Sequence, residues 1–204
     1  MGSFWALLNP FALLCGAVST AMITFHGAIY LAHRTQGEIQ WRALRAAGFF
    51  GGLLVLTFAA AGLWLWMSIP GYVIQSTVDG AALPDPLAKT VVREAGAWFA
   101  NYRRYPATLA LPLLGFAGVI AAQALARSGR TMAAFWASSL AIVGVIGTAG
   151  AALFPFIMPS SIDPDASLTV WDSVSSHLTL NIMLWATLIF MPIIIVYTSW
   201  AYRV

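Results

Sequence analysis

Three histidines, His26, His33 and His177, carry the side chains of this sequence that are best suited to hold a haem iron. A b-type haem needs one or two axial ligands that face the same cavity. His26 lies about 18 residues, or roughly 27 Å, into its apolar run. His177 starts another run from the opposite side of the membrane, so the two cannot ligate one iron. We therefore expect each of the three histidines to be a polar helix residue that hydrogen-bonds to the backbone or to a neighbouring Ser or Thr. Haem ligation is the alternative.

The longest polar stretch in the second half of the chain, Phe154 to Asn181, is the other candidate for chemistry. One interpretation is a water-exposed loop in which Asp172 or Ser173 caps the helix that follows. The alternative is a surface that docks a partner subunit near a redox site, with Trp171 beside Asp172 as the anchor. The polar side chains of this stretch are Ser160, Ser161, Asp163, Asp165, Ser167, Thr169, Asp172, Ser173, Ser175, Ser176 and His177.

The rest of the sequence offers no further catalytic pattern. Its single cysteine, Cys15, excludes an intrachain disulfide and any cluster of Cys ligands. Metal-ligand spacings and Gly-rich phosphate loops are missing, and Ser160-Ser161 lacks a nearby base. Apart from Arg45, at the start of the second run, the apolar runs contain no Asp, Glu, Lys or Arg, so we do not expect the chain alone to relay protons across a bilayer. We assign no catalytic, cofactor-binding or metal-ligating residue.

The composition places these residues in a membrane. Of 204 residues, 60% are hydrophobic and 8% are charged, against roughly 25% charged residues in a soluble domain. Five runs approach the ~20 apolar residues that cross a bilayer as a helix: 7–31, 43–69, 108–126, 132–157 and 174–200. We expect one transmembrane helical domain over residues 1–204 and no cleaved signal peptide. The net charge of +3 is then no indication of nucleic acid.

Basic residues give these runs an orientation. The loop at residues 33–45, the loop at 127–130 and the C-terminal end together carry six basic residues and one acid. The two loops of the opposite side carry four basic residues and six acids. Because Lys and Arg gather in cytoplasmic loops, we expect the C-terminus in the cytoplasm and the N-terminus outside.

Residues 85–105 predict a short amphipathic helix at the outer membrane surface. Asp85-Pro86 is typical of an N-cap followed by the first helical position. Apolar residues then recur at steps of three or four, at Leu87, Val91, Ala95, Trp98 and Tyr102.

Small residues four apart predict where helices approach one another closely. One such pair is Gly48 with Gly52, in the second run. Two more, Gly144 with Thr148 and Gly147 with Ala151, lie in the fourth run.

Six segments in order along nearly the whole chain resemble one family. They are LLNPFALLCG (7–16), GYVIQSTVDG (71–80), VVREAGAW (91–98), FPFIMPSS (154–161), SLTVWDSVSSHLTLN (167–181) and IVYTSWAYRV (195–204). Together they resemble subunit II of cytochrome bd quinol oxidase. That subunit is nearly twice as long, and this chain is similar to its C-terminal half. The resemblance implies an all-α integral membrane fold, with a four-helix bundle, a peripheral helix and the short amphipathic extracytoplasmic helix.

The resemblance also implies a function within a respiratory complex of the bacterial inner membrane. Such a complex oxidises quinol and reduces oxygen to water. Its haem b and haem d groups are held by subunit I, so this chain would be a non-catalytic structural and assembly subunit. The expected partners are the haem-bearing subunit, the missing N-terminal half of subunit II, small accessory subunits and membrane lipid. A structural quinone in subunit II is a further expectation, without contacts that map onto this chain.

Two other functions stay open on the residues alone. The first is a small self-contained cytochrome b that uses His26 or His177 as a haem ligand. The second is a small transporter, although transporters usually hold broken helices or charged residues at the bilayer midplane. The uncharged runs argue against this second alternative.

Overall fold

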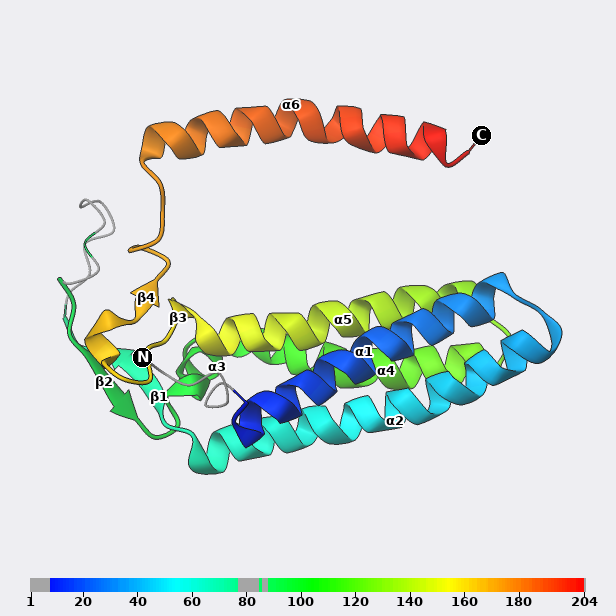
Figure 1. The fold of residues 1–204 in the computed structure, drawn as a ribbon, viewed down its shortest axis with the longest axis horizontal. Coiled ribbons are helices and arrows are strands. Elements are labelled where there is room, and N and C mark those ends of the chain that lie inside the picture. Colours follow the sequence, from blue (N-terminus) through cyan, green and yellow to red (C-terminus); the bar gives the residue numbers. More distant parts are fainter. Residues whose placement is uncertain (1–7, 77–84, 86–87, 204) are drawn as a thin grey trace.

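The computed structural model describes residues 8–76, 85 and 88–203, and within them five helices are long and apolar enough to cross a membrane. Four of them lie side by side as a bundle (Figure 1). These are α1 (Pro10–Arg34), α2 (Gly37–Ser68), α4 (Ala110–Arg127) and α5 (Thr131–Leu153). The fifth, α6 (His177–Ala201), stands apart from the bundle. The predicted all-α membrane fold, with a four-helix bundle and a peripheral helix, is confirmed.

Local sequence explains where these helices begin and turn. The Asn9 side chain accepts a hydrogen bond from the Ala12 backbone N–H at 2.8 Å, and Pro10 takes the first helical position of α1. Gly37 and Gly129 adopt φ of 66° and 79° in the two short connections at one end of the bundle. Glycine is favoured at both positions because a side chain disfavours positive φ.

Glycine also brings the backbones of α4 and α5 into close contact. A Cβ on Gly144 would lie 2.7 Å from the Cα of Gly115, and one on Gly118 would lie 2.8 Å from the backbone nitrogen of Ala141. The predicted contacts at Gly144 and Gly147 are therefore confirmed, since a Cβ on Gly147 would lie 2.8 Å from Leu111.

The predicted contact at Gly48 and Gly52 in α2 is not made within this chain, and a contact with another chain stays a prediction. A Cβ on Gly52 would meet nothing within 4 Å, and one on Gly48 only the Arg127 guanidinium at 4.0 Å. The glycine that faces the bundle is their neighbour Gly51, which lies against Gln123 and Phe25.

A small folded layer, which we call the strand cap, covers the end of the bundle opposite the glycine connections (Figure 1). Strand β1 (Gly71–Ile74) pairs antiparallel with β2 (Val91–Glu94), and β3 (Phe156–Met158) pairs antiparallel with β4 (Leu168–Thr169). The cap also contains the short helices η2 (Ala97–Phe99), α3 (Ala100–Arg104) and η4 (Pro164–Ala166). The 3-10 helix η3 (Pro106–Leu109) leads from it into α4.

Side chains join the parts of the strand cap to each other and to the bundle. The Val91 backbone N–H donates to the Asp165 carboxylate at 2.6 Å, and the Tyr72 hydroxyl donates to the Ser160 carbonyl at 2.9 Å. The Asn101 amide donates to the Ala151 carbonyl at 2.9 Å, at the end of α5. Two loops that are distant in sequence are therefore fastened into one layer.

The strand cap corrects three sequence predictions. The expected amphipathic helix over 85–105 is wrong for Val91–Glu94, which form strand β2 because β1 supplies a partner for their backbone. Its helical part is limited to η2 and α3, and Pro86 and Leu87 lie outside the described residues. The run at 132–157 ends as a helix at Leu153, before β3. The run at 174–200 becomes helical only at His177.

We expect Gly144→Ala to destabilise the bundle by about 1–3 kcal/mol, because the added methyl group forces α4 and α5 apart. Gly150→Ala, in the same helix, is the matched control, since a Cβ there meets nothing within 4 Å. Thermal unfolding of the purified membrane protein measures the difference. Equal stability of the two variants would show that the backbones do not touch at Gly144.

Candidate functional site

A buried ion pair holds the strand cap together. The Lys89 ammonium lies 2.8 Å from the Asp172 carboxylate, and the two side chains are only 4% and 8% exposed. The same carboxylate oxygen accepts hydrogen bonds from the Thr169 backbone N–H at 2.8 Å and from the Thr169 hydroxyl at 2.7 Å. The loop before β2 is thus joined to the segment that follows β4.

This geometry overturns the capping role that the sequence suggested for Asp172 and Ser173. Neither Asp172 nor Ser173 caps the last helix, because the Ser176 side chain accepts from the Thr179 backbone N–H at 3.3 Å at the start of α6. The Asp172 side chain is largely enclosed by its own contacts, whereas docking of a partner by this stretch stays a prediction. Trp171 is half-buried, with its ring centroid 6.3 Å from that of Phe154.

The electrostatics of Asp172 follow from these contacts. Burial by itself raises the pKa of a carboxyl group, because the charged form loses water. The hydrogen bonds from Lys89 and Thr169, with the Lys89 charge, outweigh burial and hold the pKa of Asp172 below its usual value of 3.8. Asp172 therefore stays ionised at neutral pH, and its role is structural.

Two of the three histidines join α1 to α5. The His26 Nδ1 lies 2.8 Å from the Ser138 hydroxyl, and the His33 Nδ1 lies 3.0 Å from the Thr131 hydroxyl. Ser138 also donates to the Phe135 carbonyl at 2.8 Å, which leaves its oxygen to accept the Nδ1–H of His26. The interpretation of these two side chains as polar helix residues bonded to Ser or Thr is confirmed.

None of the three histidines belongs to a cluster of three or more candidate metal ligands among the described residues. His177 is exposed at the start of α6, the helix outside the bundle, so it shares no cavity with His26. Across residues 8–76, 85 and 88–203, no group of three or more His, Cys, Asp or Glu side chains could hold a metal ion. The serines of the strand cap serve its own folding, as in the Ser167 hydroxyl that accepts from the Ser160 backbone N–H at 2.9 Å.

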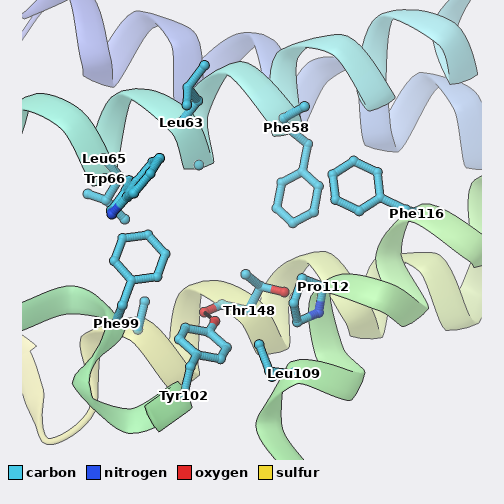
Figure 2. Close-up of a pocket in the computed structure, with 13 residues that line it drawn as sticks. Phe58, Leu63, Leu65, Trp66, Phe99, Tyr102, Leu109, Pro112, Phe116 and Thr148 are labelled. Atoms are coloured by element: carbon cyan, nitrogen blue, oxygen red, sulfur yellow. Dashed lines mark hydrogen bonds between the residues drawn. The ribbon is translucent and has the colours of Figure 1, made fainter. Parts of the chain in front are cut away.

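A pocket of about 560 Å³ opens between α2 and α4, beside the strand cap (Figure 2). Phe58 and Phe116 meet at one end of it, with ring centroids 5.0 Å apart, and Trp66 and Phe99 lie at the other end. Tyr102 reaches in from α3, and its hydroxyl donates to the Thr148 carbonyl at 2.7 Å. The lining is almost entirely carbon, so the pocket suits an apolar ligand rather than a reaction centre.

Sequence reasoning missed both the ion pair and the pocket. Lys89 was interpreted as part of the polar face of a helix, and its partner is far away along the chain. The pocket lies where α2 and α4 diverge above the Phe58–Phe116 contact. No local pattern encodes that divergence.

The fold and these contacts define a class of protein: a helical membrane protein whose four-helix bundle carries a folded cap at one end and a fifth apolar helix outside it. Comparison with known proteins gives the family. The sequence profile of cytochrome bd terminal oxidase subunit II matches residues 1–204. The chain belongs to the cytochrome bd terminal oxidase subunit II family.

Two relatives show how much of the family's protein this chain represents. It is 47% identical over 201 residues to cytochrome bd-I ubiquinol oxidase subunit 2 of Escherichia coli K12, covering 98% of this chain and 53% of the relative. It is 42% identical over 201 residues to the probable cytochrome oxidase subunit 2 of Haemophilus influenzae, with the same coverage of both chains. The chain spans about half the length of the curated relatives it matches.

We expect Lys89→Met and Asp172→Asn each to destabilise the strand cap by about 3–5 kcal/mol. Each substitution removes one charge of the pair and leaves the opposite charge buried without it. The double variant should cost less than the sum of the two single variants, since the second change removes the orphaned partner. Hydrogen exchange at the Val91 and Thr169 amides measures the opening of the cap. Glu94→Gln, at an exposed position of the same cap, is the control and should change stability by less than about 0.5 kcal/mol.

The same pair predicts an acid dependence. The pKa of Asp172 is lowered in the folded state, so its contribution is fully present above pH 3.8, its usual value, and is lost as the pH falls through the lower folded-state pKa. Hydrogen exchange of the cap amides in wild type should therefore accelerate in that acidic range. Asp172→Asn should lack this component of the pH profile, and an identical profile in both proteins would contradict the assignment.

Proposed function

We propose that this chain is a structural and assembly part of subunit II of a bd-type quinol oxidase, a complex that oxidises quinol and reduces oxygen to water. The observation that carries the proposal is the match of the family profile to residues 1–204, together with 47% identity to a ubiquinol oxidase subunit. The chemistry belongs to the complex, and we assign no catalytic residue to this chain. The quinol is of the ubiquinol class by analogy with the E. coli relative.

The histidine geometry supports a non-catalytic role. The Nδ1 atoms of His26 and His33 are used in hydrogen bonds between α1 and α5. His177 lies outside the bundle, on α6. Because His177 lies outside the bundle, it cannot join His26 as the second axial ligand of a b-type haem, which favours haem b and haem d in a partner subunit over a small self-contained cytochrome b.

Helix α6 supports assembly with partners. None of its described side chains is buried, and large apolar side chains are exposed along its length, among them Leu178 at 72% and Val196 at 69%. Such a helix packs against lipid on some faces and against protein on others. We propose the haem-bearing subunit and the other half of subunit II as its protein partners, with small accessory subunits further out.

The two ends of the bundle support a location and an orientation. Arginines gather at the end with the glycine connections, where Arg45 lies 4.6 Å from the centre of the Trp41 ring and Arg34 lies 5.7 Å from that of Tyr30. Stacked aromatic and basic side chains are typical of a membrane interface, and basic loops of the cytoplasmic side. We place this end and the C-terminus in the cytoplasm of a bacterial inner membrane, and the N-terminus and the strand cap outside.

The test is purification of the complex that contains this chain from its own membranes, followed by subunit identification and absorption spectroscopy. We expect a haem-bearing partner in near-equal amount and quinol oxidation coupled to oxygen uptake. His26→Ala should keep the haem spectrum, because we place the haem groups in the partner subunit. A haem spectrum from this chain alone that disappears in His26→Ala would instead establish a small cytochrome b. A colourless protein with no partner would refute the oxidase assignment.

A further inference from the structure

The pocket between α2 and α4 has the depth of one lipid leaflet. Phe58 at its inner end lies ten residues before the end of α2 at Ser68, which is about 15 Å at 1.5 Å per residue. That is half of the ~30 Å hydrocarbon core of a bilayer. The pocket therefore extends from the level of the headgroups to about the bilayer midplane, the depth that one acyl chain occupies.

The lining suits an acyl chain better than a ligand with a polar ring. Tyr102 and Thr148 supply the hydroxyl groups of the pocket. The Tyr102 hydroxyl donates to the Thr148 carbonyl at 2.7 Å, and the Thr148 hydroxyl donates to the Gly144 carbonyl at 2.7 Å. A quinone ring needs donors for its carbonyl oxygens, and both hydroxyl protons are already used. A saturated or unsaturated hydrocarbon chain needs none.

Two exposed arginines follow a lining residue of the pocket directly along the chain. Arg103 and Arg104 follow Tyr102 directly in α3, and both are exposed. Arg104 lies 5.5 Å from the centre of the Tyr105 ring, an aromatic neighbour suited to the interface. Within the described part of the chain, neither arginine forms an ion pair with an acidic side chain. Their charge is therefore available to an anionic phosphate group.

We propose that this pocket binds one acyl chain of an anionic phospholipid, with Arg103 and Arg104 holding the headgroup phosphate. The lipid fills the space between α2 and α4 and closes the side of the bundle that the helices leave open beside the strand cap. This proposal is independent of the oxidase assignment, since it rests on the pocket, its depth and the two exposed arginines of α3.

The test uses the purified membrane complex and phosphatidylglycerol that carries a photoactivatable group in its acyl chain. We expect crosslinks in the peptides that contain Leu63 and Leu109, two residues of the pocket wall. Gly62→Phe places a ring in the pocket, because a Cβ on Gly62 meets nothing within 4 Å. It should lower the labelling by about tenfold. Gly27→Phe, an equally open glycine on the exposed face of α1, is the control and should label as wild type.

A second pair of variants tests the headgroup. Replacing Arg103 and Arg104 by Gln should reduce the preference for phosphatidylglycerol over phosphatidylcholine by about tenfold, whereas replacing both by Lys should keep it. These exposed positions do not depend on the fit of a large side chain in the pocket.

Three results would overturn the proposal. Equal labelling of Gly62→Phe and Gly27→Phe would mean that the lipid binds elsewhere. Displacement of the phosphatidylglycerol label by a ubiquinone-type quinone, but not by unlabelled phosphatidylglycerol, would make the pocket a quinone site. No labelling of wild type, with loss of co-purifying subunits in Gly62→Phe, would show that a protein segment fills the pocket.

Discussion

The close contact of α4 with α5 at Gly115 and Gly144 is the interaction on which the rest of the structure depends. In lipid, apolar side chains gain little free energy by leaving the lipid to meet one another. Helices therefore associate where their backbones can approach closely and make many van der Waals contacts. This contact fixes the end of α5, where Thr148 and Ala151 offer carbonyl oxygens to Tyr102 and Asn101. The strand cap is anchored there. The α4–α5 contact also accounts for the pocket. Helix α4 stays close to α5, and α2 diverges from α4 beside the strand cap.

Polar groups are distributed according to the cost of leaving them unpaired in a medium without water. Within the bundle they are few and locally satisfied, as in the bonds of His26 and His33 to hydroxyl groups of α5. In the strand cap they are concentrated, and the Lys89–Asp172 pair is enclosed by the strands that it joins. The bundle and the strand cap together form the folded support that we propose as the role of this chain.

Most of the fold could be predicted from the sequence, whereas the strand cap could not. The five spans follow from long uninterrupted apolar runs, and the structure places a helix in each. The helix predicted through Val91 failed because local periodicity at three or four residues does not report that Gly71–Ile74 lies alongside as a strand partner. The assignment of Asp172 as a helix cap failed for a similar reason, since Lys89 and Thr169 compete for its carboxylate.

The sequence by itself determined that the chain lies in a lipid bilayer, how many times it crosses and, through its similarity to known proteins, its family. These follow from the sequence because hydropathy and motif identity are properties of short contiguous segments. Only the tertiary structure decided which glycine of α2 faces its neighbours, which carboxylate is buried, and where the bundle opens into a pocket. Each of these depends on residues distant in the chain meeting in space. Gly51 is selected over Gly48 and Gly52 by Phe25 and Gln123, which lie on two other helices.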